Sequence, residues 1–291
     1  MKDNHGKTTT QETLKLLEEG IKSLVNSDTY KTYLKIMSRF HNYSFGNCIL
    51  IMLQCPTATH VAGYRTWQLK FRRQVKKGAK SIHVIAPCIV EKELSDGTTV
   101  TQTYFKATYV FDIEQTDPLD GEEFPEVCHQ LTGTVDDYDR LIAALTEISP
   151  VPVSFEDYKQ SSNGYFSLKE KKIVVKASLD QKQKVKTLIH EIAHSILHDP
   201  DTGECKDDDR TMQDINMLET AAESTAFTVM YWLGLPSDDY SFAYLAAYTK
   251  DFTTLPEFHA CLNTIQKTAD SIIKQLEQKG IKSCMKASVK P

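Results

Sequence analysis

The chain has 291 residues, of which 41% are hydrophobic and 25% are charged, with a formal net charge of −5. These ordinary globular values exclude a chain that is disordered throughout, and the length allows two domains that each bury a core. The seven cysteines form no CxxC pair, the N-terminus has no apolar signal-peptide core, and no apolar run is long enough to cross a bilayer. This pattern favours a cytoplasmic protein with free thiols and no membrane partner.

The first part of the chain is expected to be helical and then to change to strands. Apolar spacing and capping residues indicate helices, and alternation of apolar and polar residues indicates strands. The expected helices cover residues 11–25, 27–40 and 44–54, and the expected strands cover residues 81–86 and 105–113. Asp96 and Gly97 give a turn signal between the two strands.

An acidic stretch with two prolines, residues 112–133, is interpreted as a linker. We therefore expect an α+β protein with an N-terminal α+β domain at 1–130 and a mostly helical C-terminal domain at 131–291. The elements expected in the second domain are a helix at 135–148, a hairpin of 165–168 with 173–175, and helices at 181–198, 217–233 and 265–279.

The motif HEIAH at residues 190–194 carries the clearest chemistry. Four residues on a helix bring His190 and His194 to the same face, which is the spacing that two nitrogens need to hold one zinc ion. Glu191 lies beside them and is the candidate catalytic base that activates a metal-bound water. The alternative is a pair of hydrogen-bonded core histidines with a salt-bridged glutamate.

A catalytic zinc needs a third protein ligand. Glu219 and Glu223, in LETAAESTAF, share one face of an otherwise apolar helix, so one of them can bind the metal while the other orients a ligand histidine. His198 is nearer in sequence, but a continuous helix rotates it away from the pair. Zinc is the expected ion, and another divalent ion such as Mn²⁺ also suits two histidines and a carboxylate.

A basic segment precedes the expected strands. Residues 65–80 contain seven Lys or Arg residues and no Asp or Glu, with aromatic residues between them. Cations follow a phosphate backbone and exposed aromatic rings stack on unpaired bases, which favours single-stranded DNA as a partner. The candidate nucleic-acid-binding residues are Arg65, Trp67, Arg72, Arg73, Lys76 and Lys77. The alternative is a solvated basic hairpin whose aromatic residues are core.

Two groups of sequence segments resemble the two domains of one known protein family. The N-terminal domain of the ArdC-like antirestriction proteins resembles the segments FHNYSFGNCILIMLQCPTATHVAGYRTWQ and RRQVKKGAKSIHVIAP. The zincin domain of the same family, which is related to the ImmA/IrrE-like metallopeptidases, resembles the segments TLIHEIAHSILH and ETAAESTAF. The resemblance covers roughly residues 10–280, but Phe71 and Ser81 stand where the family usually has glycine.

The resemblance implies a single-stranded-DNA-binding domain joined to a zinc-metallopeptidase-like domain, in a protein of plasmids and conjugative elements that protects incoming DNA from restriction. It makes His190 and His194 ligands and Glu191 the catalytic residue. The ImmA/IrrE-like pattern aligns best with Glu223 as the third ligand, whereas thermolysin-like zincins use the first glutamate of such a pair, here Glu219.

We therefore expect a single-stranded-DNA-binding antirestriction-type protein with a zinc-dependent metallopeptidase domain and an unidentified protein substrate. Two alternatives remain open. One is a regulatory metalloprotease that cleaves a repressor and uses the basic segment to dock it. The other is a non-catalytic protein that coats single-stranded DNA and uses zinc only for structure.

Overall fold

The computed structural model divides the chain into two compact units, neither of which is a single stretch of sequence. The structure describes residues 10–24, 26–93, 99–119, 135–159, 162–197, 212–235 and 255–282. Of these, unit 1 takes residues 10–24 and 46–119, and unit 2 takes 26–45 and the described residues from 135 onward. The predicted boundary at residue 130 assigns residues 26–45 to the N-terminal domain. In the structure these residues belong to unit 2.

Both units contain helices and strands, which confirms the predicted α+β class with two domains. Unit 1 holds α1 (Thr10–Ser23), most of α3 (Phe45–Gln54), β1 (Val61–Ala62), α4 (Tyr64–Lys70), β2 (Arg73–Val75), β3 (Ile82–Glu93), β4 (Thr99–Asp112), the 3-10 turn η1 (Ile113–Gln115) and β5 (Thr116–Pro118). Unit 2 holds α2 (Ser27–Arg39), α5 (Val135–Ile148), β6 (Val153–Phe155), β7 (Gly164–Ser167), β8 (Lys172–Val175), α6 (Gln181–Leu197), α7 (Met212–Trp232) and α9 (Leu255–Gln278).

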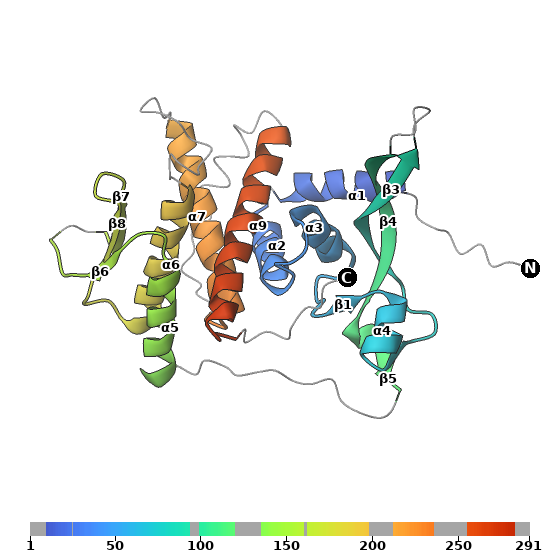
Figure 1. Cartoon of the computed structure of the whole chain (residues 1–291), viewed down its shortest axis with the longest axis horizontal. Helices are drawn as coiled ribbons and strands as arrows, with labels where there is room; N and C mark the ends of the chain where they lie inside the picture. Colours follow the sequence, from blue (N-terminus) through green and yellow to red (C-terminus); the bar gives the residue numbers. More distant parts are fainter. Residues whose placement is uncertain are drawn as a thin grey trace, which may run out of the picture. The chain divides into compact units, whose positions relative to one another are not determined.

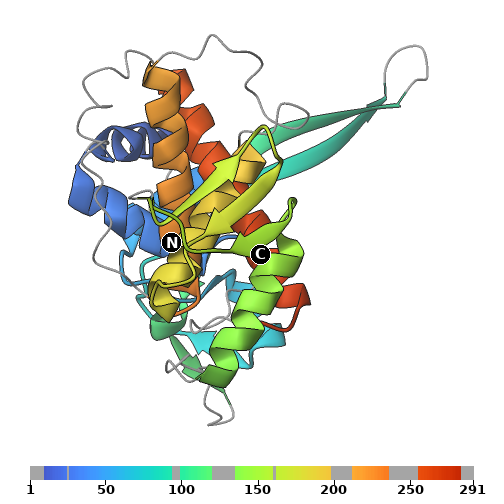
Figure 2. The same ribbon diagram turned by 90° about the vertical axis from the view of Figure 1, so that its left-hand side faces the viewer.

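The main strands of unit 1 form one antiparallel ladder, which runs from the Ile82–Val110 pair to the Glu93–Thr99 pair. Figure 2 shows β3 and β4 as a long two-stranded ribbon. Both strands are longer than the alternation of the sequence predicts, because residues such as Ile89 and Tyr104 are exposed while still paired. The turn signal at Asp96 and Gly97 lies outside the described residues.

Two side-chain amides of α3 attach that helix to the edge of β3. The amide of Asn47 donates to the carbonyl oxygen of Ile85 at 2.9 Å and accepts from its backbone N–H at 2.8 Å. Gln54 makes the same pair of bonds, each 2.9 Å long, with the backbone of His83. These amides satisfy strand groups that would otherwise form an open edge. On the other side of α3, Gly20 lets α1 approach, since an added Cβ would lie 2.5 Å from Ile49 Cγ2.

A second, smaller cluster joins α4 to the short strands β2 and β5, which pair in antiparallel fashion. Its buried members are Ala62, Trp67 and Val75. This part of the fold was expected partly as a linker, since η1 and β5 fall within residues 112–133. The first residues of that stretch belong instead to unit 1, and residues 120–134 lie outside the described part of the chain.

Unit 2 is a group of helices with a small sheet on one side. Figure 1 shows α6 beside α7, and α7 also contacts α2 and α9. The hydroxyl groups of Tyr30 on α2 and Ser224 on α7 lie 2.9 Å apart, so a buried hydrogen bond joins helices that are far apart in sequence. His41, just after α2, places its Nδ1 2.9 Å from Asp270 on α9. The helices α7 and α9 begin earlier than their apolar spacing predicts, at Met212 and Leu255.

The small sheet has the order β6-β8-β7, with β6 parallel and β7 antiparallel to β8. The expected hairpin of residues 165–168 and 173–175 is therefore present. Both β7 and β8 pack against α6. Asp180 caps that helix by accepting from the backbone N–H of Gln183 at 3.0 Å. Among the described residues, no helix has both the length and the hydropathy that a bilayer crossing requires.

The buried carboxylate of Asp112 organises the turn after β4, and its loss should unfold unit 1 more easily. Asp112 accepts from the backbone N–H groups of Thr59 at 2.8 Å, His60 at 3.0 Å and Glu114 at 3.1 Å. Asp112→Ala leaves these three donors without their acceptor, so we expect a loss of about 3–5 kcal/mol of unfolding free energy. The measurement is urea unfolding followed by the fluorescence of Trp67 in a Trp232→Phe background.

Asp117→Ala is the control for that measurement, because Asp117 is exposed and makes only a 3.6 Å ion pair with Lys76. Its unfolding midpoint should stay close to that of the parent protein. Equal effects of the two substitutions would contradict the role given to Asp112.

Candidate metal centre and nucleic-acid face

The two histidines of HEIAH lie on the buried part of α6 and point to a common position. Their spacing of one helical turn brings the Nε2 atom of His190 to 2.9 Å from the Nε2 atom of His194. The rings meet edge to face, with centroids 4.5 Å apart. Leu188, Ile189 and Ile192 are fully buried on the same helix, so packing fixes the direction of both rings.

The neighbouring helix α7 brings a carboxylate to the same position. Glu219 Oε2 lies 3.3 Å from Nε2 of His194 and 3.6 Å from Nε2 of His190. One ligand atom from each of these three residues falls within 4.8 Å of the others. Two ligand atoms bound to one tetrahedral zinc at about 2.0–2.1 Å lie roughly 3.3 Å apart, so this donor set fits a divalent ion.

Glu223 lies one turn further along α7 and meets a different atom. Its Oε2 is 3.2 Å from Nδ1 of His190, the ring nitrogen that points away from the shared position. Its other oxygen lies 3.6 Å from Nζ of Lys186. The expectation that Glu223 is the third ligand therefore disagrees with the geometry. Because the two ring nitrogens of His190 face opposite ways, α7 offers Glu219 to one and Glu223 to the other.

Interactions within this cluster shift the pKa values of His190, Glu219 and Glu223. Burial lowers the pKa of His190, but the carboxylates of Glu219 and Glu223 outweigh burial and raise it to about 9. The two histidines lower the pKa of Glu219 strongly. For Glu223, burial raises the pKa, while His190 and Lys186 more than compensate and lower it. The centre is thus a compact set of opposite charges.

Glu191 is buried beside these residues, and burial raises the pKa of its carboxyl group. It also receives a backbone hydrogen bond from Phe166 on β7. Gly164, on the same strand, allows the close approach, because an added Cβ would lie 3.2 Å from Glu191 Cγ and 2.5 Å from Thr187 Cγ2. The side chain of Glu191 is therefore held between α6 and β7.

Sequence reasoning missed the contributions of Gly164, Phe166 and Lys186 to this site. The sequence does contain one signal for Lys186, because it precedes His190 by four residues and so shares its helix face. The contacts of Gly164 and Phe166 depend on how the hairpin packs on α6, which no local pattern describes. His198, the less favoured ligand candidate, lies outside the described residues.

The predicted nucleic-acid-binding residues lie in and around α4, but Trp67 cannot stack on a base. It is only 1% exposed, contacts Phe71 with ring centroids 5.1 Å apart, and donates its indole N–H to the carbonyl oxygen of Phe111 at 2.8 Å. The prediction for Trp67 is therefore wrong, because both its ring face and its polar group are used inside the core. For this residue the alternative, an aromatic core, is the correct one.

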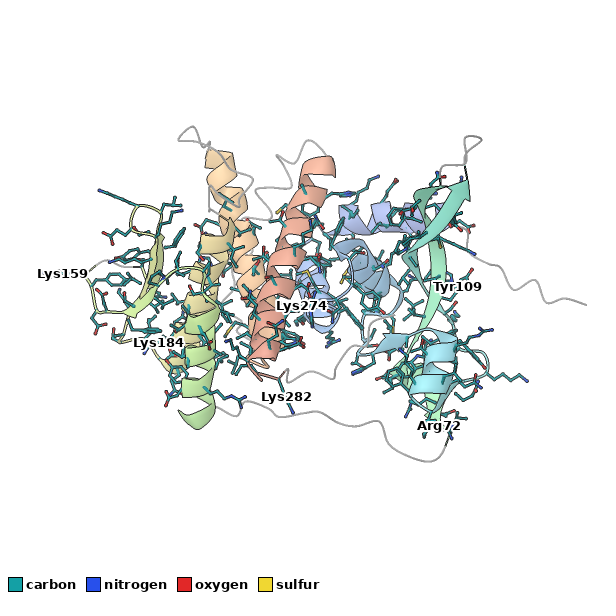
Figure 3. The ribbon with its side chains drawn as sticks, in the orientation of Figure 1. Arg72, Tyr109, Lys159, Lys184, Lys274 and Lys282 are labelled. Atoms are coloured by element: carbon teal, nitrogen blue, oxygen red, sulfur yellow. The ribbon has the colours of Figure 1, made fainter. Side chains whose placement is uncertain are left out.

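The cations of the segment differ in their surroundings. Arg73 is half-buried and donates to the side chain and the backbone oxygen of Thr116 on β5, at 2.7 and 3.1 Å. Lys76 is exposed and reaches the carbonyl oxygen of Glu114 at 2.9 Å. Arg65, Arg72 and Lys77 are exposed, and Arg72 lies directly after α4 (Figure 3). Arg73 thus helps to hold β2 to β5, while the other four side chains lie at the surface.

Comparison with known protein families gives two matches along the chain. Residues 3–111 match the N-terminal domain of anti-restriction factor ArdC. Residues 107–234 match a family described as "Putative metallopeptidase family (DUF6782)". The order of the two matches along the chain is also the order of the main segments of unit 1 and unit 2.

Comparison with individual proteins agrees with these matches. The crystal structures of the antirestriction ArdC protein from plasmid R388 align over 90% of this chain in the metal-free form and 89% in the Mn(II)-bound form, which is 98% and 97% of the R388 chains. The TM-scores are 0.62 and 0.58, and the sequence identities are 19% and 20%. An uncharacterized Bacillus anthracis protein, pXO2-81, is 24% identical over an alignment 284 residues long, which covers 84% of this chain and 47% of that protein. The chain thus spans about half the length of this curated relative.

The fold and the two family matches define a two-part protein in which an ArdC-type N-terminal domain precedes a metallopeptidase-type domain. The chain is therefore similar to ArdC in its N-terminal domain and in its fold.

The close approach of β7 to α6 should not tolerate a side chain at residue 164. Gly164→Ala places a Cβ 2.5 Å from Thr187 Cγ2, so either the strand or the helix must shift. We expect a loss of about 1–3 kcal/mol of unfolding free energy, measured by thermal unfolding of unit 2. Adding Thr187→Ser removes the clashing methyl group and should restore part of the loss, whereas Thr187→Ser alone is the matched control. No recovery in the double variant would contradict this account of the contact.

Proposed function

We propose that unit 2 is a zinc-dependent peptidase and that unit 1 binds single-stranded DNA, as parts of one antirestriction-type protein. The observation that carries the peptidase proposal is the meeting of three donor atoms beside a buried carboxylate. His190, His194 and Glu219 present their donors to one position, and Glu191 adjoins them. A metal that served structure alone would have no need of Glu191.

Each residue of the site has a distinct part in this proposal. His190, His194 and Glu219 hold the metal, and Glu223, which is itself paired with Lys186, holds His190 through its Nδ1. When bound, the metal supplies Lewis acidity that activates water and polarises a peptide carbonyl group. Glu191 accepts the proton of the attacking water and passes it to the leaving amine. Burial raises the pKa of this carboxyl group, which makes Glu191 a stronger base than an exposed glutamate.

The edge strand β7 offers a place for a peptide substrate. Among the described residues, β7 pairs with β8 on one side only. An extended peptide can add to such an edge through backbone hydrogen bonds, which require no particular side chains. Because β7 also carries the backbone contact to Glu191, a peptide bound there would lie near the catalytic residue.

Glu191→Gln should separate catalysis from metal binding. The variant keeps the metal ligands, so its affinity for Zn²⁺ should match that of the parent protein while cleavage of labelled casein falls at least about a hundredfold. Glu219→Ala should lose both properties, and Glu223→Gln should weaken metal binding about 10- to 100-fold. Zn²⁺ and Mn²⁺ are each titrated against a chelator to determine which ion binds more tightly.

Two results would contradict this assignment in different ways. Full activity in Glu191→Gln would remove Glu191 from the mechanism. A zinc-loaded parent protein that cleaves nothing, but that unfolds at a much lower temperature after chelation, would favour the alternative of a structural metal.

The basic segment supports the proposal for single-stranded DNA. It brings seven cations into residues 65–80, and Arg65, Arg72 and Lys77 among them are exposed. The family of the N-terminal domain is that of an anti-restriction factor, a function that acts on DNA. We place the protein in the cytoplasm, where restriction takes place and where the free thiols of Cys48, Cys55 and Cys88 stay reduced.

Fluorescence anisotropy with labelled single-stranded and duplex oligonucleotides tests this half of the proposal. We expect preference for the single strand and affinity that falls with salt, as counterion release requires. Removing Arg65, Arg72 and Lys77 together should lower the slope of log affinity against log salt by about 2. Lys15→Ala with Lys22→Ala, two exposed cations of α1, is the matched control. No binding at low salt would instead favour the repressor-cleaving protease, whose basic segment docks a protein.

A further inference from the structure

The short helix α4 divides its aromatic residues between the core and the surface. Trp67 is buried, and Phe71 packs against the same cluster. Tyr64, one turn before Trp67, is 46% exposed, and Leu69, on the outward side of the helix, is 75% exposed. Around the basic segment, Tyr64 is therefore the aromatic ring with a surface that a ligand can reach.

Two contacts hold the Tyr64 ring while leaving this surface open. The ring meets Phe111 edge to face, with centroids 6.4 Å apart and an angle of 74° between the planes. Its hydroxyl oxygen accepts from the side-chain amide of Gln74 on β2 at 2.5 Å. An aromatic ring that is already held loses little conformational freedom when a partner stacks on it.

Two exposed arginines of the basic segment follow Tyr64 along the chain. Arg65 is the next residue of α4 and is exposed. Arg72 follows the helix and has a φ of +53°, a left-handed conformation that is unfavourable for a residue with a side chain. The backbone oxygen of Arg72 accepts from Leu119 N–H at 2.7 Å, which holds this turn to the segment after β5. The strained turn thus fixes where the Arg72 side chain leaves the surface.

We propose that Tyr64 is the stacking platform for an unpaired base, with Arg65 and Arg72 binding phosphates of the same strand. The inference rests on the proposed single-stranded DNA binding and gives it a specific site. An exposed flat ring at the start of a segment rich in cations suits an unpaired base and its neighbouring phosphates. A base within a duplex has both faces covered, so this site selects single strands.

Tyr104 provides a matched comparison within the same unit. It lies on β4 and is 47% exposed, nearly the same fraction as Tyr64. Its surroundings differ in charge, since residues 88–106 contain three acids (Glu91, Glu93 and Asp96) and two lysines (Lys92 and Lys106). A polyanion should therefore be attracted to Tyr64 and not to Tyr104.

The experiment compares Tyr64→Ala, Tyr64→Phe and Tyr104→Ala in anisotropy titrations with a labelled single-stranded oligonucleotide. Tyr64→Ala should weaken binding about 5- to 100-fold with an unchanged salt dependence, since stacking is lost but no phosphate contact is. Tyr64→Phe keeps the ring and should retain most of the affinity, and Tyr104→Ala should bind as the parent protein does. Thermal unfolding of each variant shows whether unit 1 remains folded.

Photocrosslinking of the parent protein gives a second measurement that does not depend on the folding of a variant. An oligonucleotide carrying 5-iododeoxyuridine should crosslink to Tyr64, as identified by mass spectrometry of the peptides. Crosslinks confined to Tyr104 or other residues of the ribbon would overturn the proposal. The proposal would also be overturned if Tyr64→Ala bound single strands like the parent protein, or if it lost single-strand and duplex binding equally.

The outcome for the proposed function is separate. A parent protein that binds no single-stranded DNA refutes the DNA-binding half of the proposed function and this site with it. A parent protein that binds, with Tyr64→Ala unchanged, refutes only the site.

Discussion

Two imidazole nitrogens held 2.9 Å apart on a buried helix impose the main constraint on unit 2. Such a pair, in a poorly solvated position, requires a proton or a cation between the rings and a negative charge close by. Helix α7 supplies that charge through Glu219 and Glu223, and this role requires α7 to lie alongside α6 in one particular register. Contacts from α2 and α9 then hold α7, so most of the unit's helices serve the placement of two carboxylates.

The sequence predicts the part of the site that one helix contains. His190, Glu191 and His194 follow from helical spacing, and in the structure the two imidazole rings meet on one face of α6. The choice between Glu219 and Glu223 does not follow, because residues four apart share a helix face and are equivalent until the partner helix is placed. The axial offset of α7 against α6 decides which carboxylate meets which nitrogen of His190, and that offset is a tertiary property.

The same difference between local spacing and tertiary placement explains which features of the basic segment could be predicted. Its charge was evident in the sequence, but the division of its aromatic rings between core and surface was not. A helix of seven residues is too short for its apolar spacing to show which side is buried, and Tyr64, Trp67 and Phe71 lie at similar angles around it. The position of β2 and β5 determines which side of α4 is buried, because it encloses Trp67 with Val75. The ladder of β3 and β4 was underestimated for a related reason, since strands exposed on both faces show no alternation.

The segments of unit 2 lie before and after the main segment of unit 1 in the sequence. Translation therefore sets the order in which the two units can fold. Helix α2 leaves the ribosome long before its partners, and the hydroxyl group of Ser224 that bonds to Tyr30 is made 194 residues later. The main segment of unit 1 emerges in between, so unit 1 can fold first. Until α7 and α9 are complete, the apolar side chains of α2 that unit 2 later buries, including Leu34 and Met37, remain open to chaperones. Helices α6 and α7 therefore gain their full set of packing partners only after α9, which ends at Gln278, has been translated.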